Sequence, residues 1–346
     1  MTKYDPYADE PQQVPDKYEY YEALFDARRS GHRSRPAGKP RVKRSREEVV
    51  SELADSVVLE GGFKTTYKPG RHEAEWLLSS LHSFYDRSLI LDVLGQVKGG
   101  KEASVYRCLA HPSVGVPYLA AKVYRPRRFR TMRNDARYRR GRQILTGEGQ
   151  AAKTTDHRIM RAIGKKTKFG VQVMHTSWLM HEYAAMERLY QAGAAVPRTI
   201  ASSENAILMG YYGDEVRGAP TLNEVSLDSS QATVLFSEVC RNIELMLSHD
   251  MIHGDLSAYN ILYWQGSVVV IDFPQVIETS TNEDAYQILG RDVQRVCEYF
   301  QRQGLRCDPA ALLKELWARF VENEWTALAR AADLSVREQA FEEQDL

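Results

Sequence analysis

The sequence predicts an α+β fold in which a small β-rich part precedes a mainly helical part. Two short β runs joined by Gly99-Gly100 come first, and the second of them carries Lys122. The segment "SSQATVLFSEVCRNIELMLSHD" and most of the C-terminal third then show helical spacing of apolar residues. A short β-hairpin around Gln265-Gly266 is expected between these helices.

Composition shifts along the chain indicate five segments. We expect a disordered basic arm at 1–46, a helical extension at 47–90, the β-rich part at 91–208 with a basic insert at about 130–174, the helical part at 209–330, and an acidic tail at 331–346.

The bulk composition is that of a globular protein. The chain has 346 residues, of which 43% are hydrophobic, enough for a sizeable core. Its four cysteines stand far apart and have no histidine at ligand spacing, which argues against a disulfide framework or a zinc site. No signal peptide or long apolar run is visible, so we expect a cytoplasmic protein with no membrane contact.

The net charge is zero but unevenly distributed. Residues 28–46 contain nine Lys or Arg and no acid, and residues 122–168 contain sixteen Lys or Arg against three acids. Such tracts can be solvated tails, or they can bind a polyanion, of which RNA is the leading candidate. Both interpretations stay open.

The β-rich part contains a candidate phosphate-binding cover. "LGQVKGGKEASVYRCLA" turns at its paired glycines, whose amides can face an anion, and Lys122 follows inside the next strand, "PYLAAKVYR". A surface lysine with a buried stem would give the same pattern. A helix over Glu73 to Leu91 is expected before this sheet.

A further helix is expected from about Ser177 to Ala192, with Thr176 or Ser177 as its N-cap and Gly193 as its stop. Glu182 and Glu187 flank its apolar stripe at similar angles. Either glutamate could reach a lysine across a cleft, and either could be solvated, so the periodicity does not choose between them.

Three polar residues stand among apolar runs in "IHGDLSAYNIL" and "VVVIDFPQ". A turn at Gln265-Gly266 would pair the two β runs and bring Asn260 beside Asp272, while Asp255 lies on the incoming loop. Two oxygen ligands and one free carboxylate suit Mg²⁺-nucleotide phosphoryl transfer. A merely polar turn would explain Asn260 but not an aspartate on each side of the hairpin.

These two segments resemble the catalytic and metal-binding loops of the RIO family of atypical serine kinases. "KGGKEASVY", "AAKVY" and "WLMHEYAAMERL" are similar to that family's nucleotide loop, strand lysine and following helix. The resemblance covers roughly residues 91–303 in the same order. It implies a two-lobed protein-kinase-like fold, ATP and Mg²⁺ as cofactors, and a serine as phosphoacceptor, on another protein or on the chain itself.

The resemblance also implies residue roles. Asp255 would be the catalytic base, Asn260 and Asp272 the Mg²⁺ ligands, and Lys122 the contact to the α- and β-phosphates, with Glu182 rather than Glu187 as the partner of this lysine. The implied nucleotide-binding residues are Lys101, Ser104 and Val105 in the nucleotide loop, and Met209, Gly210 and Tyr212 at the hinge between the lobes.

The sequence departs from ordinary protein kinases. It has His253-Gly254-Asp255 in place of HRD, Asp272-Phe273-Pro274 in place of DFG, no APE, and no room for a long activation segment. RIO kinases share that absence, which leaves the phosphoacceptor open and makes water an alternative.

Two alternative functions remain at this level. Small-molecule kinases of the aminoglycoside or choline type also use HGDLxxxN, although "GKEASVY" argues against them. An ATP-gated assembly factor, docking on ribosomal or other RNA through residues 28–46 and 122–168, is the other alternative; the RIO family is associated with small-subunit ribosome maturation.

Overall fold

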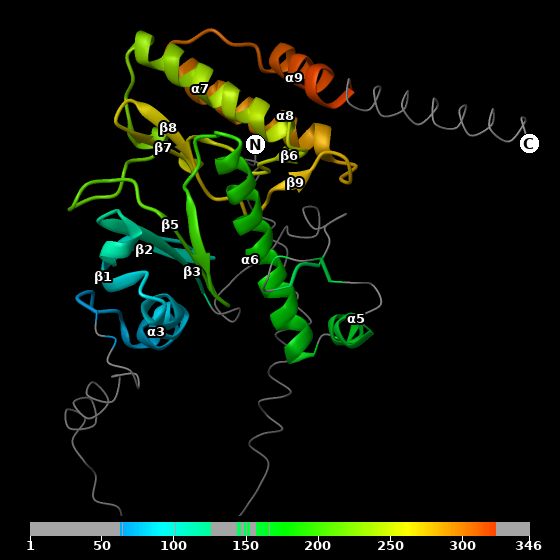
Figure 1. The fold of residues 1–346 in the computed structure, drawn as a ribbon. Coiled ribbons are helices and arrows are strands. Elements are labelled where there is room, and N and C mark those ends of the chain that lie inside the picture. The colour runs from blue at the N-terminus through cyan, green and yellow to red at the C-terminus, as the bar shows by residue number, and fades with distance from the viewer. Residues whose placement is uncertain are drawn as a thin grey trace, which may run out of the picture. The chain divides into compact units, whose positions relative to one another are not determined.

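Figure 1 shows the fold in a computed structural model, which describes residues 63, 65–100, 102–125, 144–146, 149, 151–152, 157–165 and 167–322. All of them belong to the second of the two units into which the chain divides, Asp55–Leu346. The predicted basic arm, the predicted acidic tail, Lys101 and much of the basic insert lie outside the described residues.

The first part is a five-stranded antiparallel sheet in the order β1-β2-β3-β5-β4. Its strands are β1 (Ile90–Gly99), β2 (Ala103–Ala110), β3 (Tyr118–Tyr124), β4 (Thr199–Ser202) and β5 (Ala206–Gly210). Lys122 lies on the central strand β3, paired with Val105 of β2 and with Ile207 of β5. The backbone of Lys122 is therefore paired with a neighbouring strand on each side.

Helix α3 (Arg71–Asp86) covers one face of this sheet with a separate apolar cluster that includes Leu77, Leu81 and Phe84. The helix ends earlier than the sequence predicts, because the apolar residues Ile90 and Leu91 belong to strand β1. The predicted end at Leu91 is therefore wrong, whereas the helix itself is confirmed.

Helix α6 (Lys168–Gln191) packs against the sheet and is longer than predicted. Its N-cap is Thr167, whose hydroxyl accepts a hydrogen bond from the Gly170 amide at 3.1 Å. The predicted start at Ser177 is wrong. Ser177 is an interior residue of the helix. Its hydroxyl accepts a hydrogen bond from the Leu145 amide at 2.9 Å, so this residue makes a tertiary contact instead of capping the helix. A short helix, α5 (His157–Gly164), packs against α6.

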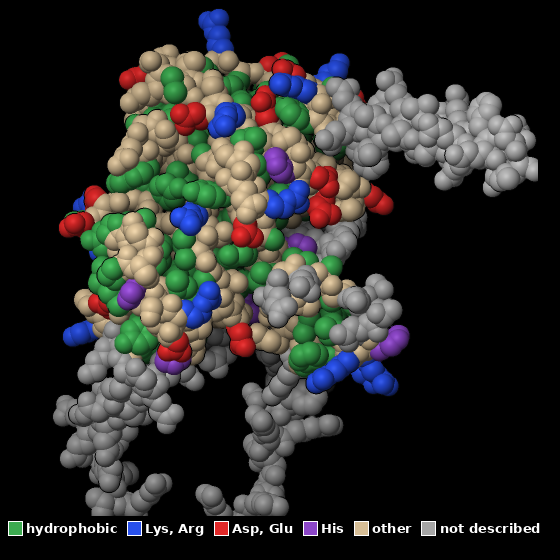
Figure 2. Space-filling view, in the orientation of Figure 1, with side chains coloured by type: hydrophobic (Ala, Val, Ile, Leu, Met, Phe, Trp, Pro, Cys, Tyr) green, Lys and Arg blue, Asp and Glu red, His purple; other side chains and the backbone are tan. Residues whose placement is uncertain are grey.

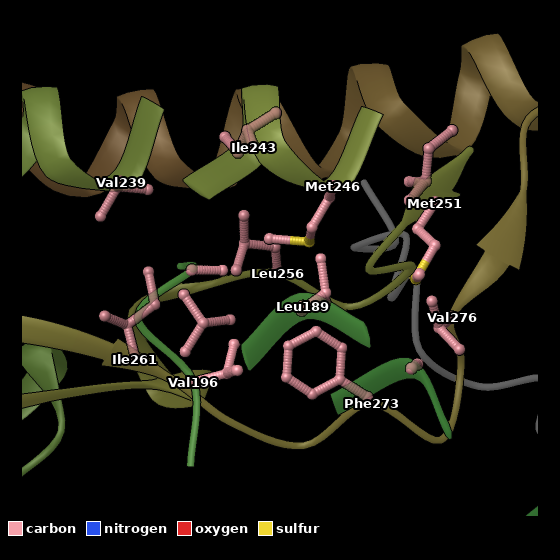
Figure 3. Packing of buried hydrophobic residues seen from close by; sticks show 14 of the residues in the cluster. Leu189, Val196, Val239, Ile243, Met246, Met251, Leu256, Ile261, Phe273 and Val276 are labelled. Atoms are coloured by element: carbon pink, nitrogen blue, oxygen red, sulfur yellow. The ribbon is translucent and has the colours of Figure 1, made fainter. Parts of the chain in front are cut away.

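The second part is mainly helical. It contains α7 (Ser229–Leu247), α8 (Ala285–Arg302), α9 (Pro309–Trp317) with a π-helical turn at Ala318–Glu322, and the short strands β6 (Met251–Ile252), β7 (Ile261–Trp264), β8 (Ser267–Val270) and β9 (Ile277–Glu278). Figure 3 shows its core, where Val239, Ile243 and Met246 of α7 face Leu189 of α6 and Phe273. The end of α6 is therefore fixed by the helical part.

The hairpin has the predicted register. Tyr263 pairs with Val268 and Ile261 with Val270, and the Ile271 amide donates to the Asn260 carbonyl at 2.9 Å. Gln265 and Gly266 both have positive φ, 49° and 85°, as a tight two-residue turn between antiparallel strands requires. The turn therefore brings Asn260 next to Ile271, the residue before Asp272, at the open end of the hairpin.

Among the helices that the structure describes, none combines the length and the apolar composition that crossing a membrane would require.

A matched pair of valines on α7 tests the placement of the core. Val239 is 0% exposed and Val234 is 54% exposed, and both Val→Ala changes gain the same helix propensity. We expect Val239→Ala to lower the free energy of unfolding by about 2 kcal/mol, because it leaves a cavity, and Val234→Ala to change it by less than about 0.5 kcal/mol. Urea titration measures both; equal effects would contradict the packing of α7.

Candidate active site

A cleft of about 1050 Å³ lies between the sheet and the hairpin loops. Eight of the predicted site residues line it: Val105, Lys122, Glu182, Met209, Gly210, Tyr212, Asp255 and Asp272. Ser104 does not line the cleft; its side chain is buried in the sheet. Asn260 is also outside the lining, but it contacts Asp255.

Lys122 is the centre of the charged groups in the cleft. It is 7% exposed, and its Nζ lies 2.5 Å from Glu182 Oε1 and 2.5 Å from Asp272 Oδ1. Burial alone would lower the pKa of this amine, but the two carboxylates outweigh burial and raise it. Lys122 is therefore a cation at any physiological pH.

The structure selects Glu182 over Glu187 as the partner of this lysine. Glu182 is 1% exposed and uses both oxygens, since Oε1 accepts from Lys122 and Oε2 accepts from the Tyr124 hydroxyl. Glu187, one turn and a half further along α6, is exposed. Tyr124 was not among the predicted site residues, although its place two residues after Lys122 puts it on the same face of β3.

Asp272 follows β8 in the left-handed region of the backbone, with φ of 74°. Aspartate tolerates this backbone conformation better than most residues. The hydrogen bond from Lys122 fixes the direction of its side chain. Burial would raise the pKa of Asp272, but the Lys122 charge and hydrogen bond outweigh burial and lower it. The carboxylate is ionised, and its side chain is still 43% exposed.

Asp255 and Asn260 are held together by the loop between β6 and β7. Asn260 Nδ2 donates to the Asp255 carbonyl at 2.8 Å and lies 3.3 Å from Asp255 Oδ2. Because these bonds use the amide nitrogen, the amide oxygen of Asn260 is the atom left for a cation. An amide oxygen and the ionised Asp272 carboxylate form the kind of oxygen donor pair that Mg²⁺ takes from proteins.

The loop that carries Asp255 depends on close backbone packing at Gly254. This glycine has φ of 83°, and a Cβ built on it would lie 2.3 Å from the Gln275 carbonyl oxygen. The buried His253 ring accepts from the Asp255 amide at 3.3 Å and contacts the Ile271 carbonyl at 3.1 Å. Burial lowers the pKa of His253, which fits a neutral ring with its proton on Nε2.

Sequence reasoning missed three residues of α8 that support this loop. Asp292 Oδ2 accepts from the Gly254 amide at 2.8 Å, and Arg291 donates to the Gly254 carbonyl. Arg295 Nη1 lies 2.7 Å from Asp255 Oδ1. One signal was present: Asp292 occupies a position on the apolar face of α8, between Leu289 and Val296, where a carboxylate needs a partner.

The arrangement is that of kinase-like proteins. A β-rich part and a helical part enclose a cleft, in which a lysine is paired with a glutamate and an aspartate beside a loop that carries Asp255 and Asn260. The RIO domain family model matches residues 148–312. The chain is 32% identical to the RIO-type serine/threonine-protein kinase Rio1 of Haloferax volcanii, over 63% of this chain and 66% of that protein. It is 30% identical to RIO1 of Chaetomium thermophilum, over 64% of this chain and 41% of that protein. The chain belongs to the RIO family of atypical kinases, because it also covers 68% of a RIO-type Rio1 kinase to which it is 30% identical.

Two further comparisons fix the extent of this likeness. The Rio1 protein of Thermoplasma acidophilum is 30% identical over 38% of this chain and 68% of its own length, so the chain spans between about two fifths and two thirds of these curated relatives. The crystal structure of the Rio2 kinase from Chaetomium thermophilum superimposes with a TM-score of 0.50 at 21% identity, covering 78% of this chain and 76% of that chain. The predicted two-lobed, protein-kinase-like fold is confirmed.

The buried ion pair on α6 can be tested with two glutamates of the same helix. We expect Glu182→Gln to lower the free energy of unfolding by about 1–3 kcal/mol, because Lys122 loses a buried charged partner. Glu187→Gln should change it by less than about 0.5 kcal/mol, since this side chain is exposed. Urea unfolding at pH 7 measures both variants; similar values for the two would contradict the pairing.

Asp292 predicts a dependence of stability on pH. Burial, as the largest cause, raises its pKa to about 7, against a value near 4 in the unfolded chain. The folded state therefore binds more protons between these values, and stability falls as pH rises through this window. Relative to Asp292→Asn, the wild type should lose about 2–3 kcal/mol between pH 5 and pH 8. A constant difference across this range, measured by urea titration, would contradict the buried carboxyl.

Proposed function

We propose that this protein is a RIO-type kinase that transfers the γ-phosphoryl group of ATP to a serine hydroxyl, on another protein or on itself. The observation that carries the proposal is the ion pair of Lys122 with Glu182 and Asp272 at the wall of the cleft, beside the loop of Asp255 and Asn260. Family membership supports a protein acceptor over the small-molecule acceptor of the aminoglycoside or choline type.

Each charged group has a role in this proposal. Lys122, kept protonated by its neighbours, would contact the α- and β-phosphates, with Glu182 fixing its direction. Asn260 and Asp272 would hold Mg²⁺, which neutralises charge on the phosphates when it is bound. The adenine base of ATP would be surrounded by Val105 and by the hinge residues Met209, Gly210 and Tyr212, all four of which line the cleft.

The transfer step assigns Asp255 as the base. The serine oxygen forms a bond to the γ-phosphorus, the bond from that phosphorus to the β,γ-bridging oxygen breaks, and ADP leaves with the electron pair. The hydroxyl proton passes to the Asp255 carboxylate, which lies at the cleft with 40% of its side chain exposed. Water in place of serine would make the same step an ATP hydrolysis.

A polyanionic partner remains part of the proposal. Helix α5 carries the exposed side chains of Arg158 and Arg161, and the exposed Lys165 follows its last residue. Figure 2 shows Lys and Arg side chains gathered at the position that Figure 1 labels α5. These residues belong to the basic tract 122–168, the described part of which supports binding to RNA or a ribosomal particle.

The assay that tests the activity uses the pure protein, Mg²⁺ and γ-labelled ATP, with and without RNA. We expect label on protein, and we expect Asp255→Asn and Asp272→Asn each to lower its transfer by about 100-fold or more. Asp272→Asn should also weaken Mg²⁺-ATP binding, whereas Asp255→Asn should not, because Asp255 is not assigned to the metal or the phosphates.

Glu187→Gln is the surface control and should retain wild-type transfer. Label on a small molecule would support the phosphotransferase alternative, and label released as phosphate would indicate an ATPase. Equal transfer by wild type and Asp255→Asn would remove the proposed base.

A further inference from the structure

Arg295 reaches the carboxylate of Asp255 from outside the cleft. Its Nη1 lies 2.7 Å from Asp255 Oδ1, and each of the two side chains is 40% exposed. Arg295 is absent from the lining of the cleft, whereas Asp255 belongs to it. The guanidinium therefore lies beside the proposed base, on the side away from the volume that a nucleotide would fill.

The guanidinium has donors to spare at this place. It carries five N–H donors in a planar fork, and within the described part of the chain its hydrogen bond goes to Asp255. The neighbouring charges on α8 are already engaged: Arg291 donates to the Gly254 carbonyl, and Glu298 accepts from Gln294 at 2.7 Å. Arg295 is thus the cation of α8 that combines exposure with contact to the base.

The proposed reaction places a second demand on the same carboxylate. A serine hydroxyl must donate its proton to Asp255, where Oδ1 already accepts from Arg295 and Oδ2 lies 3.3 Å from Asn260 Nδ2. When the hydroxyl proton passes to Asp255 in the proposed step, the carboxylate is neutralised and Arg295 loses its anionic partner. An anion carried by the acceptor itself would replace that partner, and a carboxylate matches the guanidinium fork in two parallel hydrogen bonds.

We propose that Arg295 is a specificity-determining residue that binds a carboxylate next to the acceptor serine, so that the protein selects acidic peptides. This inference rests on the proposed kinase function and adds to it the chemical class of the acceptor. The face of α8 beside Asp255 is the surface on which the flank of such a peptide lies.

Two serine peptides that differ only in charge test the proposal, one with Asp on both sides of the serine and one with Asn. For the wild type we expect kcat/KM to be about fivefold higher for the Asp peptide, mainly through a lower KM, as for a half-exposed ion pair. Arg295→Gln should bring the ratio near one, and Arg295→Lys should keep part of it.

Arg302→Gln is the matched control, since Arg302 is an exposed arginine in the last turn of the same helix and should leave the ratio as in the wild type. If Arg295→Gln also displaces Asp255, kcat falls equally for both peptides. The ratio of their kcat/KM values is not affected by such a fall. Equal kcat/KM values in the wild type, or a preference that persists in Arg295→Gln, would overturn the proposal.

A binding measurement separates this proposal from the proposed function. The two peptides, made with alanine in place of serine, are titrated by fluorescence anisotropy against the full chain with Mg²⁺-ADP. Tighter binding of the Asp peptide that Arg295→Gln abolishes supports the acidic site even if no peptide is phosphorylated, in which case the kinase activity alone has failed. Equal binding of both peptides overturns the acidic site.

Discussion

The site depends on one buried cation. Lys122 enters the cleft from the central strand of the sheet, and a lone ammonium there would lose most of its hydration without compensation. Its two carboxylate partners come from α6 and from the loop after β8, so three segments that are distant in the sequence must meet for the charge to be neutralised. The ion pair therefore aligns the sheet with the helical part, and it also sets the direction of Asp272, whose left-handed backbone would otherwise be unfavourable.

The Asp255 loop obeys a related constraint. It has little regular secondary structure, so its backbone groups need partners from outside, and α8 provides them through Arg291 and Asp292 on either side of Gly254. The loop is thus fixed by a helix that begins only after the chain has returned along β9 to pair with β6. A carboxyl at the buried position of Asp292 costs stability when it ionises, and the hydrogen bond that it accepts from the Gly254 amide offsets part of that cost.

Local patterns predicted the parts of this structure that local forces determine. The turn at Gln265-Gly266 and the alternation of its strands fixed the hairpin, and with it the pairing of Asn260 with Ile271, the residue before Asp272. The choice between Glu182 and Glu187 needed the partner across the cleft, which helical periodicity does not contain. Strand alternation did carry one unused signal: Ser104 and Val105 are consecutive in β2, so their side chains must face opposite sides, and Val105 is the one at the cleft. The contacts of α8 with the Asp255 loop join residues that are distant in the sequence. The one sequence signal for them was Asp292, a carboxyl on the apolar face of the helix.

The short path from Asp272 to α8 bears on how an acceptor is held. Residues 273–284 pack back onto the molecule, with Phe273 buried against His253 and β9 paired with β6, so little of this connection is free to form a peptide platform. Under the proposed function, an acceptor must then be bound by other elements next to Asp255, the proposed base. Two elements have exposed surface there: the loop between β6 and β7, where Tyr259 lines the cleft and is largely exposed, and α8, where Arg295 contacts Asp255. In ordinary kinases a movable segment forms the acceptor surface. Here α8 contacts the proposed base and also faces the solvent beside it, so under the proposed function Arg295 couples acceptor selection to the position of Asp255.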